Sequence, residues 1–103
     1  MIRNNIIVGN AQWFDVLPLG TPTMDFNDVW NNEGGNYSGI IPGPHDISVD
    51  PAWVDPANGD FDLAPGSPCI DAGDPANYPS TDFEGDLRPV GPAPDIGADE
   101  YHP

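Results

Sequence analysis

Acidic side chains occur at alternate positions in two short stretches of the chain. Asp82, Glu84 and Asp86 are spaced two residues apart with Gly85 among them, and Asn58, Asp60 and Asp62 repeat that spacing. Hard oxygen ligands on such a turn could hold Ca²⁺. An EF-hand does not match, because the glycine falls at position four and the closing glutamate is absent. The alternative is that these acids form the solvent face of a strand.

Catalysis by paired carboxylates is a second chemistry to weigh. A glycosidase needs two carboxyl groups about 5–10 Å apart, but with 17 acids in the chain such pairs arise by chance. A polysaccharide lyase would need a basic side chain beside calcium, and only Arg3 and Arg88 are present. Cys69 has no recognisable histidine partner for thiol catalysis, so we assign no catalytic residue.

Aromatic side chains could stack against sugar rings. Trp13 and Trp30, with Tyr37, have polar neighbours and are the predicted glycan contacts, whereas Trp53 fits a core position better. The expected ligand is a neutral polysaccharide, since the chain is strongly acidic.

Composition limits the classes of partner. The 103 residues include 2 Lys+Arg against 17 Asp+Glu, giving a net charge of −15. Nucleic acid and anionic membranes would be repelled, so neither is an expected partner. One small domain is expected at this length. A single cysteine excludes an internal disulfide.

The elements that must position these residues are short strands. Proline recurs too often beyond residue 41 for an ordinary helix. Apolar residues alternate with polar ones at Met24/Phe26, Ile47/Val49 and Phe61/Leu63, which predicts strands with one buried face. Residues 5–10 and 26–31 superimpose at an offset of 21, which pairs Val8 with Val29 and favours a solenoid whose corner Asn residues stack. A β-sandwich would fit the strand lengths equally well, although the turn pair Asn58-Gly59 occurs only once.

Several motifs resemble the C-terminal segment of right-handed parallel β-helix proteins, a secreted bacterial type associated with polysaccharides. They are NNIIVGN (4–10), DFNDVWNN (25–32), ISVDPAWVD (47–55), FDLAPGSPCIDAG (61–73), DFEGDLRP (82–89) and DIGADEY (95–101). The resemblance covers nearly the whole chain, with Cys69 standing where Ala is usual. It implies an all-β fold, namely a short right-handed parallel β-helix of about two to three coils, with an extracellular or cell-surface location.

Within one domain, residues 1–63 would then form the coils and residues 64–103 an irregular Pro/Gly/Asp-rich cap. Ile70, Ile96 and Tyr101 are expected to plug the end of the coil core, with Arg88 paired to a carboxylate. At the other end, Ile2, Ile6 and Val8 would be exposed together and favour self-association.

Two functions follow as hypotheses. The first is a non-catalytic capping or structural module of a β-helix that contributes to glycan binding or adhesion and requires no cofactor, with Ca²⁺ as an optional ligand. The alternative is a residual polysaccharide-active enzyme, a lyase or glycosidase, that uses carboxylates and calcium. For the non-catalytic module, the resemblance implies that the catalytic surface of such β-helix proteins lies on coils that precede this segment.

Overall fold

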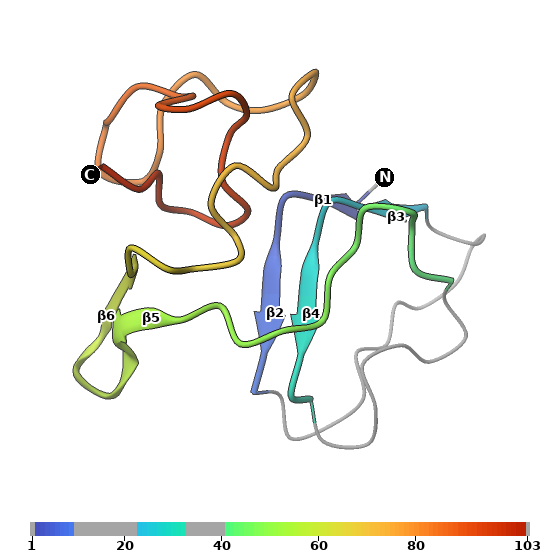
Figure 1. Ribbon diagram of the computed structural model, residues 1–103, viewed down its shortest axis with the longest axis horizontal. Helices are drawn as coiled ribbons and strands as arrows, with labels where there is room; N and C mark the ends of the chain where they lie inside the picture. Colours follow the sequence, from blue (N-terminus) through green and yellow to red (C-terminus); the bar gives the residue numbers. More distant parts are fainter. Residues whose placement is uncertain (1, 10–22, 33–40, 103) are drawn as a thin grey trace.

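Figure 1 shows the computed structural model of the chain, which describes residues 2–9, 23–32 and 41–102. Its strands are short: β1 (Ile2–Arg3), β2 (Ile6–Val8), β3 (Met24–Asp25), β4 (Asp28–Trp30), β5 (Trp53–Asp55) and β6 (Asp60–Leu63). Helix in these ranges is limited to the single 3-10 turn η1 (Pro56–Asn58). The described chain is therefore all-β, and it contains no helix long and apolar enough to cross a membrane.

The strands within residues 2–8 pair in parallel with those within residues 24–30, at a constant offset. β1 pairs with β3, with Ile2 opposite Met24, and β2 pairs with β4, with Ile7 opposite Val29. Both pairs have an offset of 22 residues, so the predicted offset of 21 is wrong by one. Side chains alternate between the faces of a strand, and the offset of 22 is the one that puts Ile7 and Val29 in the same hydrophobic cluster.

Left-handed corners repeat at the same offset. Asn4 (φ 61°) corresponds to Phe26 (φ 58°), and Gly9 (φ 68°) corresponds to Asn31 (φ 54°). Glycine and asparagine adopt this conformation readily, whereas phenylalanine does so at a cost. The Phe26 ring stacks on His45 with centroids 4.3 Å apart, which helps to hold this corner.

Parallel pairing reaches a third segment only briefly. Ile47 forms a parallel bridge with Asp28, and its N–H donates to the Asn27 carbonyl at 2.8 Å. β5 and β6 then form an antiparallel hairpin closed by η1 and by Gly59 at φ 81°. The Pro56–Gly59 turn thus reverses the chain within residues 1–63, the range where coils were expected. The sheets among the described residues have two strands each, and no continuous solenoid sheet runs through them.

Two of the predicted alternating pairs do not share a buried face. In β6, Leu63 is buried while Phe61 is 49 % exposed, and Val49 is exposed although Ile47 packs inward. The hairpin register shifts between Trp53 and Asp55, and the Phe61 ring packs edge-on against Trp53 with centroids 4.8 Å apart. Phe61 therefore contacts Trp53 within the hairpin and is not buried in a core.

The apolar residues form two clusters rather than one. Met24 and Val29 pack with Ile2 and Ile7, whereas the second cluster is built on three buried residues from the later part of the chain and includes Ile6. Ile6 and Ile7 are neighbours in β2 and point to opposite faces, so the β2–β4 pair separates the clusters. The second cluster contains Leu63, Cys69 and Ile96, packed against Ile6, Ile47, Trp53, Ile70, Ala72 and Tyr101.

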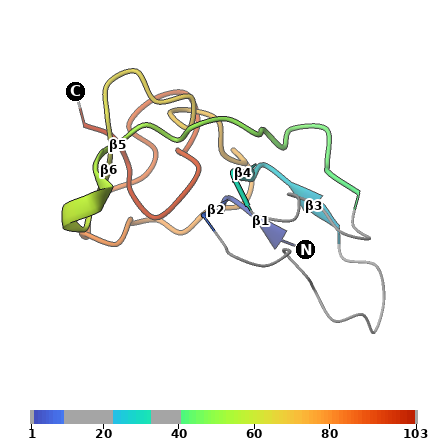
Figure 2. The ribbon, with the colours of Figure 1, turned by 90° about the horizontal axis from the view of Figure 1, so that it is seen from below.

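The structure locates the residues behind two expectations. Ile96 belongs to the second cluster, and Ile70 and Tyr101 pack against it. Ile2 and Ile6 are partly buried against opposite clusters, and Val8 is also half-buried, so the three do not form one exposed apolar face. In both views the segment after β6 lies on the same side of the parallel strands as the hairpin (Figure 1 and Figure 2).

Carboxylates satisfy much of the backbone of the irregular C-terminal segment. Asp82 accepts hydrogen bonds from the N–H groups of Glu84, Asp86 and Glu100. Asp95 likewise accepts N–H groups at 2.8 and 2.6 Å, from residues 71 and 101. Backbone donors that find no strand partner must be paired elsewhere when buried. Part of the acidic composition therefore serves to pair backbone N–H groups of this segment.

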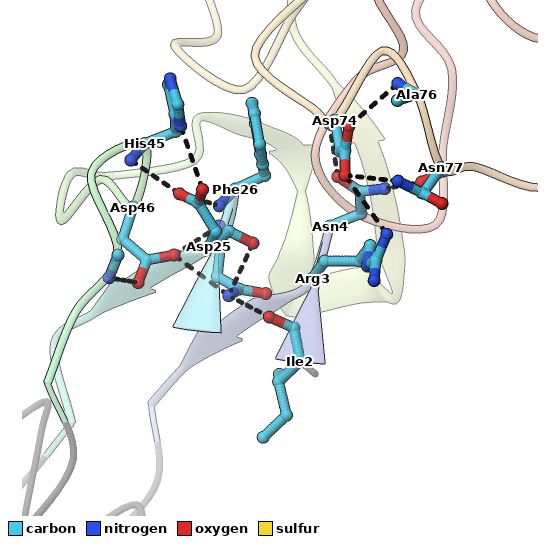
Figure 3. Close-up of polar contacts among 12 residues, drawn as sticks. Ile2, Arg3, Asn4, Asp25, Phe26, His45, Asp46, Asp74, Ala76 and Asn77 are labelled. Carbon is cyan, nitrogen blue, oxygen red and sulfur yellow. Dashed lines mark hydrogen bonds and ion pairs between the residues drawn. The ribbon is translucent and has the colours of Figure 1, made fainter. Parts of the chain in front are cut away.

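The C-terminal segment is fastened to the first strands through Asn4 (Figure 3). The Asn4 carbonyl accepts the Gly97 N–H at 2.9 Å, and its side-chain oxygen accepts the Asp74 N–H at 2.7 Å. Arg3 Nη1 lies 3.4 Å from Asp74 Oδ2. These contacts join residues 70, 71 and 93 positions apart in the sequence.

Gly43 is a position where the fold requires glycine. A Cβ added there would overlap the backbone carbonyl oxygen of Met24. We expect Gly43→Ala to lower the free energy of unfolding by about 1–3 kcal/mol. Gly66→Ala is the matched control, since its Cβ would meet nothing within 4 Å, and should change stability by less than about 0.5 kcal/mol. Urea denaturation measures both, and equal effects would contradict this close approach.

Candidate functional site

A hollow of about 630 Å³ lies between the β5–β6 hairpin, the first strands and the C-terminal segment. Three aromatic side chains line it: Trp53 is half-buried, Phe61 is 49 % exposed and Phe83 is 64 % exposed. We call this hollow the aromatic groove. Concave sites with aromatic walls and a few polar groups are typical ligand sites.

The polar lining of the aromatic groove offers mainly acceptors. Asp60 and Asp62 contribute carboxylates, and no donor among the described residues reaches the Asp62 carboxylate. Asn4 and Asn5 also line the groove, but their amide nitrogens donate at 2.8 Å to the carbonyls of Asn77 and Arg3, respectively. The free polar groups at the groove are therefore mostly negative.

Three carboxyl groups from separate segments meet beside this groove. Oxygens of Asp62, Glu84 and Asp99 lie within 4.8 Å of one another. The hydrogen bond with Asp99, together with desolvation and the charge of Asp62, raises the pKa of Glu84 to about 7. Burial raises the pKa of Asp99, although the Leu63 N–H opposes this. Glu84 and Asp99 therefore share a proton up to near-neutral pH.

The predicted calcium trio of Asp82, Glu84 and Asp86 does not converge on one point. Asp82 uses both oxygens to accept backbone N–H groups, and Glu84 joins the cluster just described. Asp86 instead lies 3.3 Å from His102 Nε2, and these two form a second group with Asp82. The sequence analysis missed His102 and Asp99 as partners.

The second predicted trio is also divided. Asn58 lies in η1 and donates to Asp55 Oδ2 at 2.8 Å, and Asp60 accepts the Asp62 N–H at 3.1 Å. The turn breaks the extended conformation that would have put Asn58 on the same face. Only Asp62 of this trio belongs to an acidic cluster.

The donor chemistry of the Asp62–Glu84–Asp99 cluster suits a hard cation. Each carboxylate supplies oxygen, and Ca²⁺ takes about 6–8 such ligands, so water would have to complete the sphere. Binding would also require Glu84 to lose its proton, which makes affinity rise with pH. The calcium expectation therefore applies to this cluster rather than to either trio.

A pH dependence of stability follows from Glu84. Its folded pKa of about 7 exceeds the ordinary value of 4.5, so the folded state binds more protons between those limits. Stability contributed by this carboxyl is present below about pH 4.5 and is lost as the pH rises to about 7. We expect Glu84→Gln to flatten part of the fall in Tm between about pH 5 and about pH 7.5, measured by circular dichroism. Asp60→Asn, on the β5–β6 hairpin beside Asp62 but outside the cluster, should retain the wild-type slope.

The predicted glycan contacts lie elsewhere or outside the described part. Trp30 is half-buried in β4, opposite Val8, and Trp13 and Tyr37 lie outside the described residues. Trp53, expected in the core, packs against the second cluster and also lines the aromatic groove. One sequence signal was overlooked: the triplet acid–Phe–acid occurs twice, at residues 60–62 and 82–84, and both copies reach the groove.

The remaining reactive groups serve the fold. Cys69 is fully buried, and its Sγ donates to Asp28 Oδ2 at 3.3 Å. Burial, with the adjacent Asp28 charge, raises the pKa of the Cys69 thiol well above its usual range, so no thiolate forms near neutral pH. Arg88 Nε lies 3.5 Å from Glu100 Oε2, which is the carboxylate partner that the structure gives it.

Comparison of the chain with protein-family models, with curated proteins and with solved structures finds no match, so its function is argued from the geometry above.

Proposed function

We propose that this chain is a non-catalytic closing module at the end of a short right-handed parallel β-helix. The observation that supports it most is the constant offset of 22 residues shared by the strand pairs and by the left-handed corners. A regular offset with matched corners is typical of successive turns of a solenoid. Crossover connections between parallel strands are right-handed in nearly all proteins, which favours that hand.

The C-terminal segment supports the closing role. It covers the face of β2 that carries Ile6, and its buried carboxylates take up backbone donors that have no strand partner. A segment with many prolines and charges also resists addition of further strands. The C-terminal segment thus covers one face of the parallel strands and does not fill the space inside a coil.

A non-catalytic role is supported by the state of the basic groups. Arg3 and Arg88 are each within 3.4–3.5 Å of a carboxylate, so neither is free to act as a lyase base. The alternative, a residual polysaccharide-active enzyme, predicts product release from a neutral polysaccharide with calcium present, which chromatography would detect.

The closing role is tested by fusion. The chain would be joined, in register, to a parallel β-helix from which the last coil and cap have been removed. We expect the fusion to be monomeric and to melt cooperatively, whereas the truncated β-helix aggregates. A fusion lacking residues 64–103 is the control and should aggregate as well. Aggregation of the complete fusion to the same extent would overturn the proposal.

The outer edge of β2 is where a preceding segment would pair. Among the described residues β2 pairs only with β4, in a two-stranded sheet. In the absence of such a segment, we expect two copies of the chain to associate through this edge. Size-exclusion chromatography with light scattering tests this, and a monomer at millimolar concentration would contradict it.

A further inference from the structure

Two copies of one sequence triplet meet at the aromatic groove. Residues 60–62 (Asp-Phe-Asp) belong to β6, and residues 82–84 (Asp-Phe-Glu) form part of a turn in the C-terminal segment. Phe61 and Phe83 both line the hollow of about 630 Å³ and keep about half or more of their surface exposed. Exposed aromatic rings on both sides of one cavity are unusual for packing and favour ligand contact.

The free polar groups around these rings accept hydrogen bonds. No donor among the residues that the structure describes is bonded to the Asp62 carboxylate, whereas the nearby Asn4 and Asn5 amides already donate within the protein. A ligand rich in hydroxyl groups needs donors as well as acceptors in its site. A ligand that brings N–H donors and positive charge matches this lining better.

Arginine and lysine side chains have the required combination of groups. Their alkyl stems pack on apolar surface, and their charged ends interact with ring faces and carboxylates. A guanidinium also binds a carboxylate through two parallel hydrogen bonds. The net charge of −15 would attract such a partner from a distance.

A second hollow of about 470 Å³ shares Phe83 with the first and limits where the positive group can lie. Its charged lining residues, Arg3, Arg88 and Asp82, are already paired with groups of the protein. The aromatic groove instead holds the Asp60 and Asp62 carboxylates. The positive group of a ligand is therefore expected in the aromatic groove.

We infer that the aromatic groove binds a basic peptide segment of another protein, with an arginine or lysine stem against Phe61 and Phe83 and its charged end at Asp62. This inference goes beyond the closing role and does not depend on it, since the groove exists whether or not further coils precede the chain. Its partner is defined by chemistry: an extended, positively charged segment with a free side-chain cation.

The test uses the full chain and a blocked pentapeptide, Gly-Arg-Gly-Arg-Gly, titrated by calorimetry. The matched ligand has citrulline in place of arginine, which keeps the shape and removes the charge. We expect the arginine peptide to bind at least about tenfold more tightly than the citrulline peptide, and its affinity to fall as salt rises from about 50 to about 200 mM. Equal binding of the two peptides would overturn the inference.

Variants separate this groove from general attraction to an acidic surface. Phe83→Ala and Asp62→Asn should each weaken binding of the arginine peptide by about fivefold or more without lowering Tm. Leu87→Ala, which removes an apolar side chain 74 % exposed and outside the groove, should have no effect. If all three variants bind the peptide like wild type, only nonspecific attraction is present and the inference fails. Binding of a neutral oligosaccharide that Phe83→Ala abolishes, without peptide binding, would assign the groove to a glycan instead.

Discussion

Asn27→Ala is expected to lower the free energy of unfolding by about 3–5 kcal/mol, one of the two largest effects in this protein. Asn27 is fully buried, and its amide nitrogen donates to the Ile2 carbonyl at 3.0 Å and to Asp46 Oδ1 at 3.0 Å. Its amide oxygen accepts the Asn5 N–H at 3.0 Å. One side chain thus ties together all three parallel segments. Alanine would leave several buried polar groups without partners, and each such group costs about 1–3 kcal/mol.

Urea denaturation followed by tryptophan fluorescence measures this effect. Asn58→Ala is the matched control, because Asn58 is exposed and its amide makes one hydrogen bond to Asp55. The control should lose no more than about 0.5 kcal/mol. A loss below about 1 kcal/mol for Asn27→Ala would mean that water replaces these hydrogen bonds and that the segments are held mainly by apolar packing.

The same residue shows how far the sequence could predict the fold. Stacking of asparagine amides between successive segments was expected at the corners. Among the described residues the structure joins Asn5 to Asn27, with Asn5 Nδ2 3.3 Å from Asn27 Oδ1. A match of two residues in six cannot separate an offset of 21 from one of 22. The side-chain alternation that decides between them depends on which face is covered, and that is set by tertiary packing.

The hairpin illustrates a local signal that was given too little weight. Pro56 and the pair Asn58-Gly59 are strong turn formers, and Gly59 takes the left-handed conformation that closes η1. The all-β class itself was predictable, because prolines exclude long helices wherever they recur. The end of parallel pairing at Ile47 was not, since it depends on how the later chain packs against β4.

The acidic cluster could not have been located from spacing. Asp62, Glu84 and Asp99 come from three segments whose proximity is set by the hairpin and the turn at residues 82–86. Spacing within a segment was informative in another way, because Asp82 receives the N–H groups two and four residues later. Aspartate followed by a glycine-containing turn is a known signal for such local bonds, and it predicts structure rather than metal binding.

Arg88→Met is expected to give the second large loss, about 3–5 kcal/mol. The side chains of Arg88 and Glu100 are 3 % and 0 % exposed, and Arg88 Nη2 also donates to the Gly97 carbonyl at 2.9 Å. Glu100 accepts the N–H groups of Val90 and Asp95. Removing the arginine would leave the Glu100 carboxylate buried without its counter-ion. Arg3→Met is the matched control and should cost at most about 1 kcal/mol, because Arg3 is 30 % exposed in its pair with Asp74.

A second substitution identifies the cause of that loss. In Arg88→Met/Glu100→Gln the buried charge is gone, while the glutamine oxygen can still accept one backbone N–H. We therefore expect the double variant to be more stable than Arg88→Met alone, although less stable than wild type, by thermal and urea unfolding at pH 7. If Glu100→Gln destabilises Arg88→Met further, the loss comes from the packing and hydrogen bonds of Arg88, and the carboxylate does not need the arginine charge. A double variant that regains stability would show that Arg88 is present chiefly to neutralise Glu100, which allows this carboxylate to accept backbone donors in the interior of the C-terminal segment.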